Sequence, residues 1–145
     1  MGQKVNPNGL RVGVIRDWNS RWQVDKKNFG DTLVEDSHIR QDCEERLFSA
    51  GVPKIEIERT FDSATGAAKV KINVFCSKPG MVIGRGGTEI DKIRMDIEKK
   101  IGKSVNLNIV EVKNADTNAQ LVAENVAQQL ERRVAFRRAV KQAIG

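Results

Sequence analysis

Apolar residues in the first half of the chain recur at helical spacing. Ile39, Cys43 and Leu47 follow one another every four residues, and charged residues fill most of the positions between them. This spacing predicts an amphipathic helix over residues 31–50. Gly51 and the proline two positions later are typical signals for the end of a helix.

The next apolar residues alternate with polar ones, which is the period of a half-buried strand. Residues 54–59 and 69–74 both show this alternation, and the loop 62–66 reads Asp-Ser-Ala-Thr-Gly. We therefore expect a hairpin. Residues 105–109 alternate in the same way and predict a third strand, and the change of phase at Val110 indicates a bulge near its end.

A second amphipathic helix is predicted between the hairpin and the third strand. Thr88, with Asp91 three residues later, is a candidate capping box at its start, and Gly102 marks its end. The apolar stripe of this helix consists of Ile90, Ile93, Ile97 and Ile101.

The last part of the chain contains two apolar stripes that one straight helix cannot align. An α-helix turns 100° per residue, so residues spaced by four drift around its surface. We therefore expect a break near residues 132–136, followed by a short helix that places Arg137, Arg138 and Lys141 opposite its apolar side. The first stripe consists of Val122, Val126, Leu130 and Val134, and the second of Phe136, Ala139, Val140, Ala143 and Ile144.

A glycine-rich turn, Gly84-Arg85-Gly86-Gly87, directly precedes the second predicted helix. Glycine lets the backbone approach another molecule closely, and the first amides of a helix lack intrahelical partners. A phosphate at this turn would accept from those amides and from the Arg85 guanidinium. The turn could equally be a packing corner between two helices, because short glycine motifs are weakly specific.

Charge is distributed in blocks along the 145 residues. The net charge is +6, and the positive blocks are residues 1–27, residues 60–103 and residues 131–145, each with a net charge of +4. A basic chain favours polyanionic partners such as nucleic acid. Separate basic blocks predict several distinct contacts and not one uniformly basic surface.

The N-terminal block reads as an arm without sustained periodicity. It is rich in Gly, Asn and Arg, and we expect it to become ordered against a partner. Its candidate contacts with RNA are Lys4, Arg11 and Arg16. Trp18 and Trp22 either stack on bases or cover the edge of the folded domain, and we favour the second role.

Composition argues against several classes of protein. Cys43 and Cys76 are the only cysteines, so a disulfide framework is not expected and a reducing compartment is favoured. We expect no membrane span and no signal peptide, which indicates a cytoplasmic protein. His38 is the only histidine. We predict no metal site, no cofactor and no enzymatic activity, because no group of catalytic or metal-binding residues recurs at a useful spacing.

The order helix, strand, strand, glycine turn, helix, strand resembles the type II K-homology fold, whose Gly-x-x-Gly loop clamps single-stranded RNA. Three segments, 1–7, 79–84 and 129–139, are also similar to the third-protein family of the bacterial small ribosomal subunit. The resemblance implies an α+β domain with a three-stranded sheet, a basic arm over 1–27, a K-homology domain over 28–113 and a helical extension over 114–145. Members of that family continue into a second domain, which is expected to be missing here.

The resemblance also implies partners. Gly84, Arg85, Gly86 and Gly87 would bind small-subunit ribosomal RNA together with the arm, in the head of the subunit and beside other head proteins. Arg137, Arg138 and Lys141 would line the entrance of the messenger RNA channel and assist unwinding. The alternative is a free-standing regulatory module that uses the same glycine loop on a single-stranded target.

Overall fold

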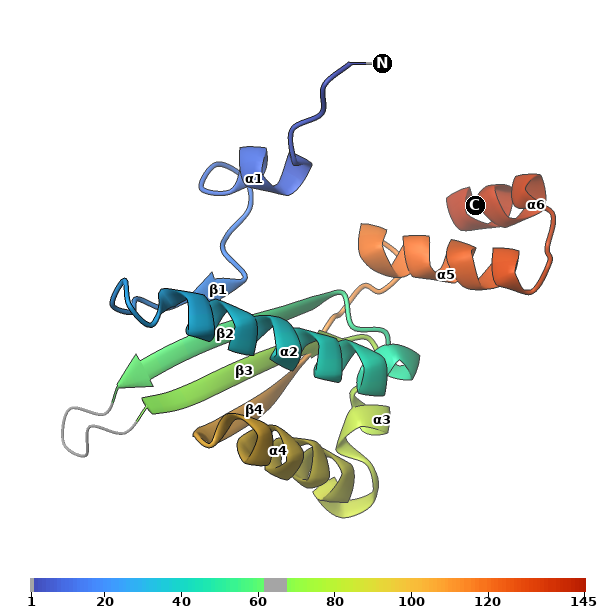
Figure 1. Cartoon of the computed structure of the whole chain (residues 1–145). Coiled ribbons are helices and arrows are strands. Elements are labelled where there is room, and N and C mark those ends of the chain that lie inside the picture. Colours follow the sequence, from blue (N-terminus) through green and yellow to red (C-terminus); the bar gives the residue numbers. More distant parts are fainter. Residues whose placement is uncertain (1, 62–67) are drawn as a thin grey trace.

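The structure is a computed structural model that describes residues 2–61 and 68–145, with Arg85 described in its backbone alone. Its secondary-structure elements form an α+β arrangement (Figure 1). In chain order they are α1 (Pro7–Arg11), β1 (Ser20–Arg21), α2 (Phe29–Leu47), η1 (Phe48–Ala50), β2 (Lys54–Phe61), β3 (Ala68–Cys76), α3 (Pro79–Ile83), η2 (Arg85–Gly87), α4 (Thr88–Ile101), β4 (Ser104–Glu111), α5 (Ala119–Glu131) and α6 (Phe136–Ile144). The α+β class and the predicted order around the glycine loop are confirmed.

One sheet forms the centre of the molecule, with the strand order β1-β2-β3-β4. β2 and β3 run antiparallel, as the hairpin prediction requires, and β4 runs parallel to β3. The sheet has one strand more than the three predicted, because Ser20 and Arg21 of the arm pair in parallel with Ile57 and Glu58. Two residues are too few to show a period, which is why the pattern did not indicate this strand.

The core lies between the sheet and the two long helices, α2 and α4, which lie on the same side of it (Figure 1). Alternate strand residues point into this layer, and burying each large aliphatic side chain contributes roughly 1.5–3 kcal/mol. The predicted stripe of α2 is buried, and Ile93 and Ile97 of α4 are buried with it. The strand residues of the core are Ile55, Ile57, Val70, Ile72, Val74, Cys76, Val105 and Leu107.

Two boundaries differ from the sequence prediction. The helix predicted over 31–50 is α2 followed by the 3₁₀ turn η1, and it ends at Gly51, which has a φ of 65°. The bulge predicted near Val110 is wrong, since the pairing of β3 with β4 continues through Val110 to Glu111. Val110 lies on the outer face of the sheet beside Phe75, so its apolar side chain does not indicate a change of phase. The predicted turn over 62–66 lies outside the described residues.

The predicted break near the C-terminus is confirmed. α5 ends at Glu131, Arg133 adopts a φ of 62°, and α6 begins at Phe136. α6 folds back alongside α5 (Figure 1) and buries Ala139. The other large apolar residues of its stripe, including Phe136, remain exposed. Among the described residues, no helix has the length and apolar character to cross a membrane.

Candidate nucleic-acid interface

The glycine loop adopts a backbone conformation that only glycine takes without strain. Gly84, Gly86 and Gly87 have φ angles of 68°, 66° and 82°, in the region that L side chains rarely occupy. A Cβ atom built on Gly86 or Gly87 would meet no other atom within 4 Å. The outer side of the loop is therefore open to the close approach of another backbone.

The predicted capping box at the start of α4 is wrong. Thr88 has helical angles and is already the first residue of α4, while Gly87 occupies the N-cap position. Thr88 is therefore N1 and Asp91 is N4, one position beyond the N3 place that a capping box requires. A glycine cap has no side chain to accept from the helix amides, so a ligand could take that role.

Two carboxylates partly compensate the positive end of the α4 helix dipole. Glu89 and Asp91 lie in the first turn of α4, where acidic side chains already compensate the helix dipole. Each also forms an exposed ion pair on the helix, with Lys92 at 3.0 Å and with Arg94 at 3.4 Å. The positive end of the α4 dipole is therefore already partly compensated by side chains of the helix itself.

The edge of the sheet beside α3 and α4 offers further backbone groups. Val105 of β4 donates its N–H to the Glu98 carboxylate at 2.9 Å, so the N–H of this residue points away from β3, to the outer edge of the sheet. Strand alternation then directs the N–H and C=O groups of Leu107 and Ile109 to the same edge. Within the described sheet no strand pairs with that edge. Donors and acceptors are thus available on the side of the sheet where the glycine loop lies.

The arm carries its predicted contacts on the other side of the sheet. Lys4, Arg11 and Arg16 are exposed, and α1 buries no residue. β1 is at the opposite edge of the sheet from β4, and α1 lies beyond it (Figure 1). The structure therefore does not bring these three cations to the glycine loop.

A buried carboxylate attaches the base of the arm to the domain. Asp36 of α2 accepts from the Ser20 hydroxyl at 3.0 Å and from the Trp22 indole at 2.7 Å. Arg59 of β2 pairs with the same carboxylate at 2.6 Å. Arg40, one turn further along α2, donates to Ser20 Oγ at 2.5 Å. Sequence reasoning missed this network, and the only signal for it was a carboxylate and a guanidinium one helical turn apart.

The two tryptophans differ. The ring of Trp22 lies 5.5 Å from that of Phe29, centroid to centroid, and Trp22 covers the edge of the domain as predicted. Trp18 is 63% exposed, so it does not cover the edge. Its backbone N–H donates to the Asp17 carboxylate, and this bond, with the nearby Arg21, lowers the pKa of Asp17.

The C-terminal cations form one exposed basic surface. Arg137, Arg138 and Lys141 line a shallow depression on α6 together with Gln142. All three are exposed, whereas Ala139 of the same helix is buried. Within the described part of the chain no carboxylate pairs with any of the three. Their charge is therefore available to an external anion.

Comparison with known proteins agrees with this arrangement. The family model described as the KH domain matches residues 38–117, more than half of the chain. The chain belongs to the KH-domain family. The matched span contains the glycine loop with the strands and helices on both sides of it.

Individual related proteins match almost the whole length of this chain, beyond the KH domain. The small ribosomal subunit protein uS3 of Clostridium perfringens is 56% identical over 145 residues, which cover 99% of this chain and 63% of that protein. The uS3 proteins of Alkaliphilus oremlandii and Clostridioides difficile are each 58% identical and are covered over 58% and 51% of their lengths. The resemblance to the small-subunit family is confirmed, and the chain spans less than two thirds of these relatives.

Ion pairs bridge the two long helices of the KH domain on their outer side. They connect α2 with α4 and with the turn that follows it, and all three N–O distances are 2.8 Å or less. Exposed pairs contribute little individually. The pairs are Glu35 with Lys103, Asp42 with Lys100, and Arg46 with Asp96.

These pairs change the acidity of their carboxyl groups. Burial raises the pKa of Glu35, but hydrogen bonds from Lys103 and Arg59 outweigh it, so the net effect is a lowered pKa. The hydrogen bond from Arg46 lowers the pKa of Asp96. Both groups therefore favour the folded state while they are ionised.

The two thiols of the KH domain take no part in these ion pairs. Cys43 and Cys76 are buried, and burial raises the pKa of the Cys43 thiol to about 11. A thiol of that pKa is protonated and unreactive at neutral pH. The described residues contain no group of three side chains that could hold a metal ion.

Proposed function

We propose that the chain is a structural, non-enzymatic protein of the small ribosomal subunit that binds ribosomal RNA. The observation that carries the proposal is the identity of 56–58% with uS3 proteins along 98–99% of this chain. The relatives are named as ribosomal proteins, and the chain has the net positive charge that such a partner requires. Its location would be the cytoplasm, within the small subunit.

Within that role we propose contacts with two kinds of RNA. The glycine loop and the arm would contact ribosomal RNA, and α6 would contact messenger RNA. The Gly84–Gly87 loop would hold the backbone of a single-stranded segment, because a Cβ atom on Gly86 or Gly87 would meet no atom within 4 Å and glycine adopts these positive φ angles without strain. The arm would add contacts through Lys4, Arg11 and Arg16 on the other side of the domain, in the head of the subunit beside other head proteins.

The second contact would be messenger RNA at the entrance of its channel. Arg137, Arg138 and Lys141 lie on one exposed side of α6, and no carboxylate among the described residues pairs with them. Charges of this kind attract phosphate without reading bases, which suits a path along which any sequence must pass. Holding single strands on this surface would favour the unwinding of structured messengers.

Co-sedimentation tests the ribosomal role against a free-standing KH module. Small subunits are stripped of their own copy of the protein with salt and then mixed with the labelled chain. We expect the chain to sediment with the subunits and to remain bound after a wash at moderate salt. A chain that binds single-stranded RNA in solution but stays in the supernatant would contradict the ribosomal role and support the regulatory module.

A further inference from the structure

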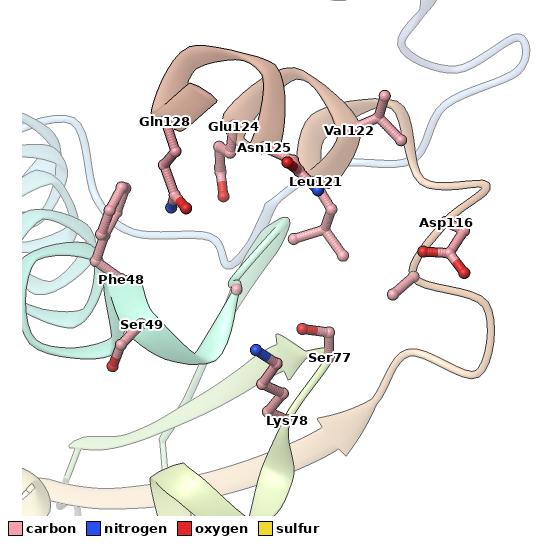
Figure 2. Close-up of a pocket in the computed structure, with 12 residues that line it drawn as sticks. Phe48, Ser49, Ser77, Lys78, Asp116, Leu121, Val122, Glu124, Asn125 and Gln128 are labelled. Atoms are coloured by element: carbon pink, nitrogen blue, oxygen red, sulfur yellow. The ribbon is translucent and has the colours of Figure 1, made fainter. Parts of the chain in front are cut away.

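A cavity of about 260 Å³ lies between the KH domain and α5. Figure 2 shows α5 on one side of it, with Gln128 and Leu121 directed toward η1 and β3 and Asn125 beside Leu121, and shows Ser77 and Lys78 on the opposite side. Phe48 stands at the rim. The cavity is at the far end of α3 from the glycine loop, because Lys78 directly precedes this helix and Gly84 directly follows it.

The floor of the cavity is fixed by close backbone contacts. Gly51 has a φ of 65°, and a Cβ built there would approach Ser77 Oγ to 2.7 Å and Leu121 Cδ2 to 3.2 Å. Ser77 donates its hydroxyl to the Ala50 carbonyl at 3.0 Å and its N–H to the Gly51 carbonyl at 3.0 Å. Lys78 donates its N–H to Ala50 at 3.2 Å. The hollow is therefore formed by a rigid turn and not by a loose loop.

The walls offer hydrogen-bonding groups that the described residues leave unused. Gln128 is half-buried, and its side-chain amide forms no hydrogen bond with the described part of the chain. The Lys78 ammonium is exposed and also forms no hydrogen bond with the described residues. Asn125 accepts from Gln129 at 2.9 Å through its oxygen, which leaves its NH₂ group to donate. Phe48 is 57% exposed, so one large aromatic side chain beside these groups is not part of the core.

The free amide groups, the ammonium and the exposed aromatic ring together favour one kind of ligand over others. An apolar molecule would leave the amide groups without partners, which is costly. An isolated phosphate would meet the carboxylates of Asp116 and Glu124 as well as the single cation of Lys78. A flat heterocycle with donors and acceptors along its edge satisfies the amides and stacks on the ring of Phe48. The volume suits one such group and not a longer oligomer.

We propose that this cavity binds one unpaired nucleotide of RNA. The base stacks on Phe48, Asn125 and Gln128 bond its edge, and the Lys78 ammonium lies beside its phosphate. The inference rests on the proposed RNA-binding function. It adds a site one short helix away from the glycine loop: at 1.5 Å per residue, the five residues of α3 span about 7 to 8 Å. A strand held at the loop thus has its neighbouring nucleotides within reach of the cavity.

The binding test uses the full chain and a fluorescent 12-nucleotide single-stranded RNA that contains all four bases. Phe48→Ala is expected to weaken binding roughly 5- to 150-fold, the range for loss of one base–aromatic stack. Gln128→Ala should weaken it about 2- to 10-fold, as for one lost hydrogen bond. Gln41→Ala is the matched control, since its amide bonds Glu45 on the surface of α2. It should bind as the unchanged chain does.

A second measurement locates the base. Free nucleosides, which lack phosphate, are titrated into the ¹⁵N-labelled chain and followed by NMR. We expect shifts at Gly51, Ser77 and the side-chain amides of Asn125 and Gln128, and their loss in Phe48→Ala. Inorganic phosphate alone should not reproduce them. Shifts confined to Gly84–Gly87 would overturn the cavity proposal.

A loop variant, Arg85→Asp with Gly86→Asp, separates the two proposals. If it loses RNA binding while Phe48→Ala and Gln128→Ala bind like the unchanged chain, the cavity proposal fails and RNA binding at the loop stands. If the loop variant and both cavity variants bind like the unchanged chain, or if the unchanged chain binds no RNA, both proposals fail. Circular dichroism of each variant shows whether the fold persists, and Phe48→Leu keeps an apolar side chain without an aromatic face.

Discussion

The two basic ends of the chain both form short helices, but their cations have different partners. In the arm, Arg11 donates to the Pro7 carbonyl at 3.2 Å and Arg16 donates to the Asn8 side chain at 2.5 Å. On α6 the three cations have no carboxylate partner in the described part of the chain, and the helix packs against α5. The two ends have equal net charge in the sequence but use it differently. The arginines of the arm stabilise the arm's own turn, whereas the cations of α6 have no carboxylate partner among the described residues.

The attachment of the arm is where we expect the largest effect on stability. Asp36→Ala removes the acceptor of Ser20 and Trp22 and leaves the Arg59 guanidinium, 6% exposed, without that partner. Breaking a buried ion pair from one side costs about 3–5 kcal/mol. Urea unfolding measures the loss. Asp17→Ala is the control, because its exposed pair with Arg21 should contribute less than about 1 kcal/mol. Equal losses in both variants would contradict the anchoring role.

The free charge of α6 should appear in the salt dependence of RNA binding. Replacing Arg137, Arg138 and Lys141 with alanine should lower the slope of log affinity against log salt by roughly two to three units if each contacts a phosphate. Alanine preserves the helix. The double variant Arg11→Ala with Arg16→Ala should lower the slope by less per residue, since these guanidinium groups already have partners. Identical effects per residue would remove the distinction between the two ends.

The same triple variant tests the messenger role in the full-length protein on the ribosome. Translation through a stable messenger hairpin should slow, while an unstructured message should be translated at the normal rate. The measurement compares elongation on the two templates. Equal slowing on both, or none on either, would contradict the placement of α6 at the entrance of the channel.

Deleting residues 1–16 should change the melting temperature by less than about 3 °C, the shift that about 1 kcal/mol produces in a domain of this size. The reason is that α1 buries no residue. Incorporation into small subunits should nevertheless fall, because the deletion removes Lys4, Arg11 and Arg16. Extending the deletion through Trp22 is the control, and it should lower the melting temperature much further by removing the partners of Asp36. A large loss from the shorter deletion would place the arm in the core.

The smallest effect is expected from pH. Because the pKa values of Glu35 and Asp96 are lower in the folded state than in the unfolded chain, their contribution to stability is present at neutral pH. It is lost as the pH falls through the folded-state pKa values. Urea midpoints measured between neutral and strongly acidic pH should therefore fall less in Glu35→Gln than in the unchanged chain. The same fall in both would show that this carboxylate does not contribute.

Sequence periodicity predicted the elements of the KH domain because each helix and each strand buries one face in the core between the sheet and the helices. The four-residue spacing of Ile39, Cys43 and Leu47 and the alternation in β2 and β3 report that burial directly. The break before α6 could be predicted from the drift of two stripes. The missed strand β1 and the misplaced capping box depend instead on single side-chain and backbone bonds, which leave no period.

The candidate site was predictable in part. The glycines of the loop indicate its backbone conformation, and the phase of α6 indicates an exposed basic side. The network around Asp36 and the cavity beside Gln128 could not be predicted. They join residues distant in the chain, and the residue types involved are common on any surface.

The most direct test of the RNA contact at the glycine loop is RNA binding by the loop variant Arg85→Asp with Gly86→Asp. We expect an unchanged circular dichroism spectrum and binding to small-subunit ribosomal RNA weakened by about tenfold or more, since a hydrogen bond to a charged group contributes about 1.5–3 kcal/mol. Aspartate tolerates a positive φ better than most residues, so the loop can keep its shape. The same fold with the same affinity would show that the glycine loop is a packing corner and would contradict the proposed RNA contact.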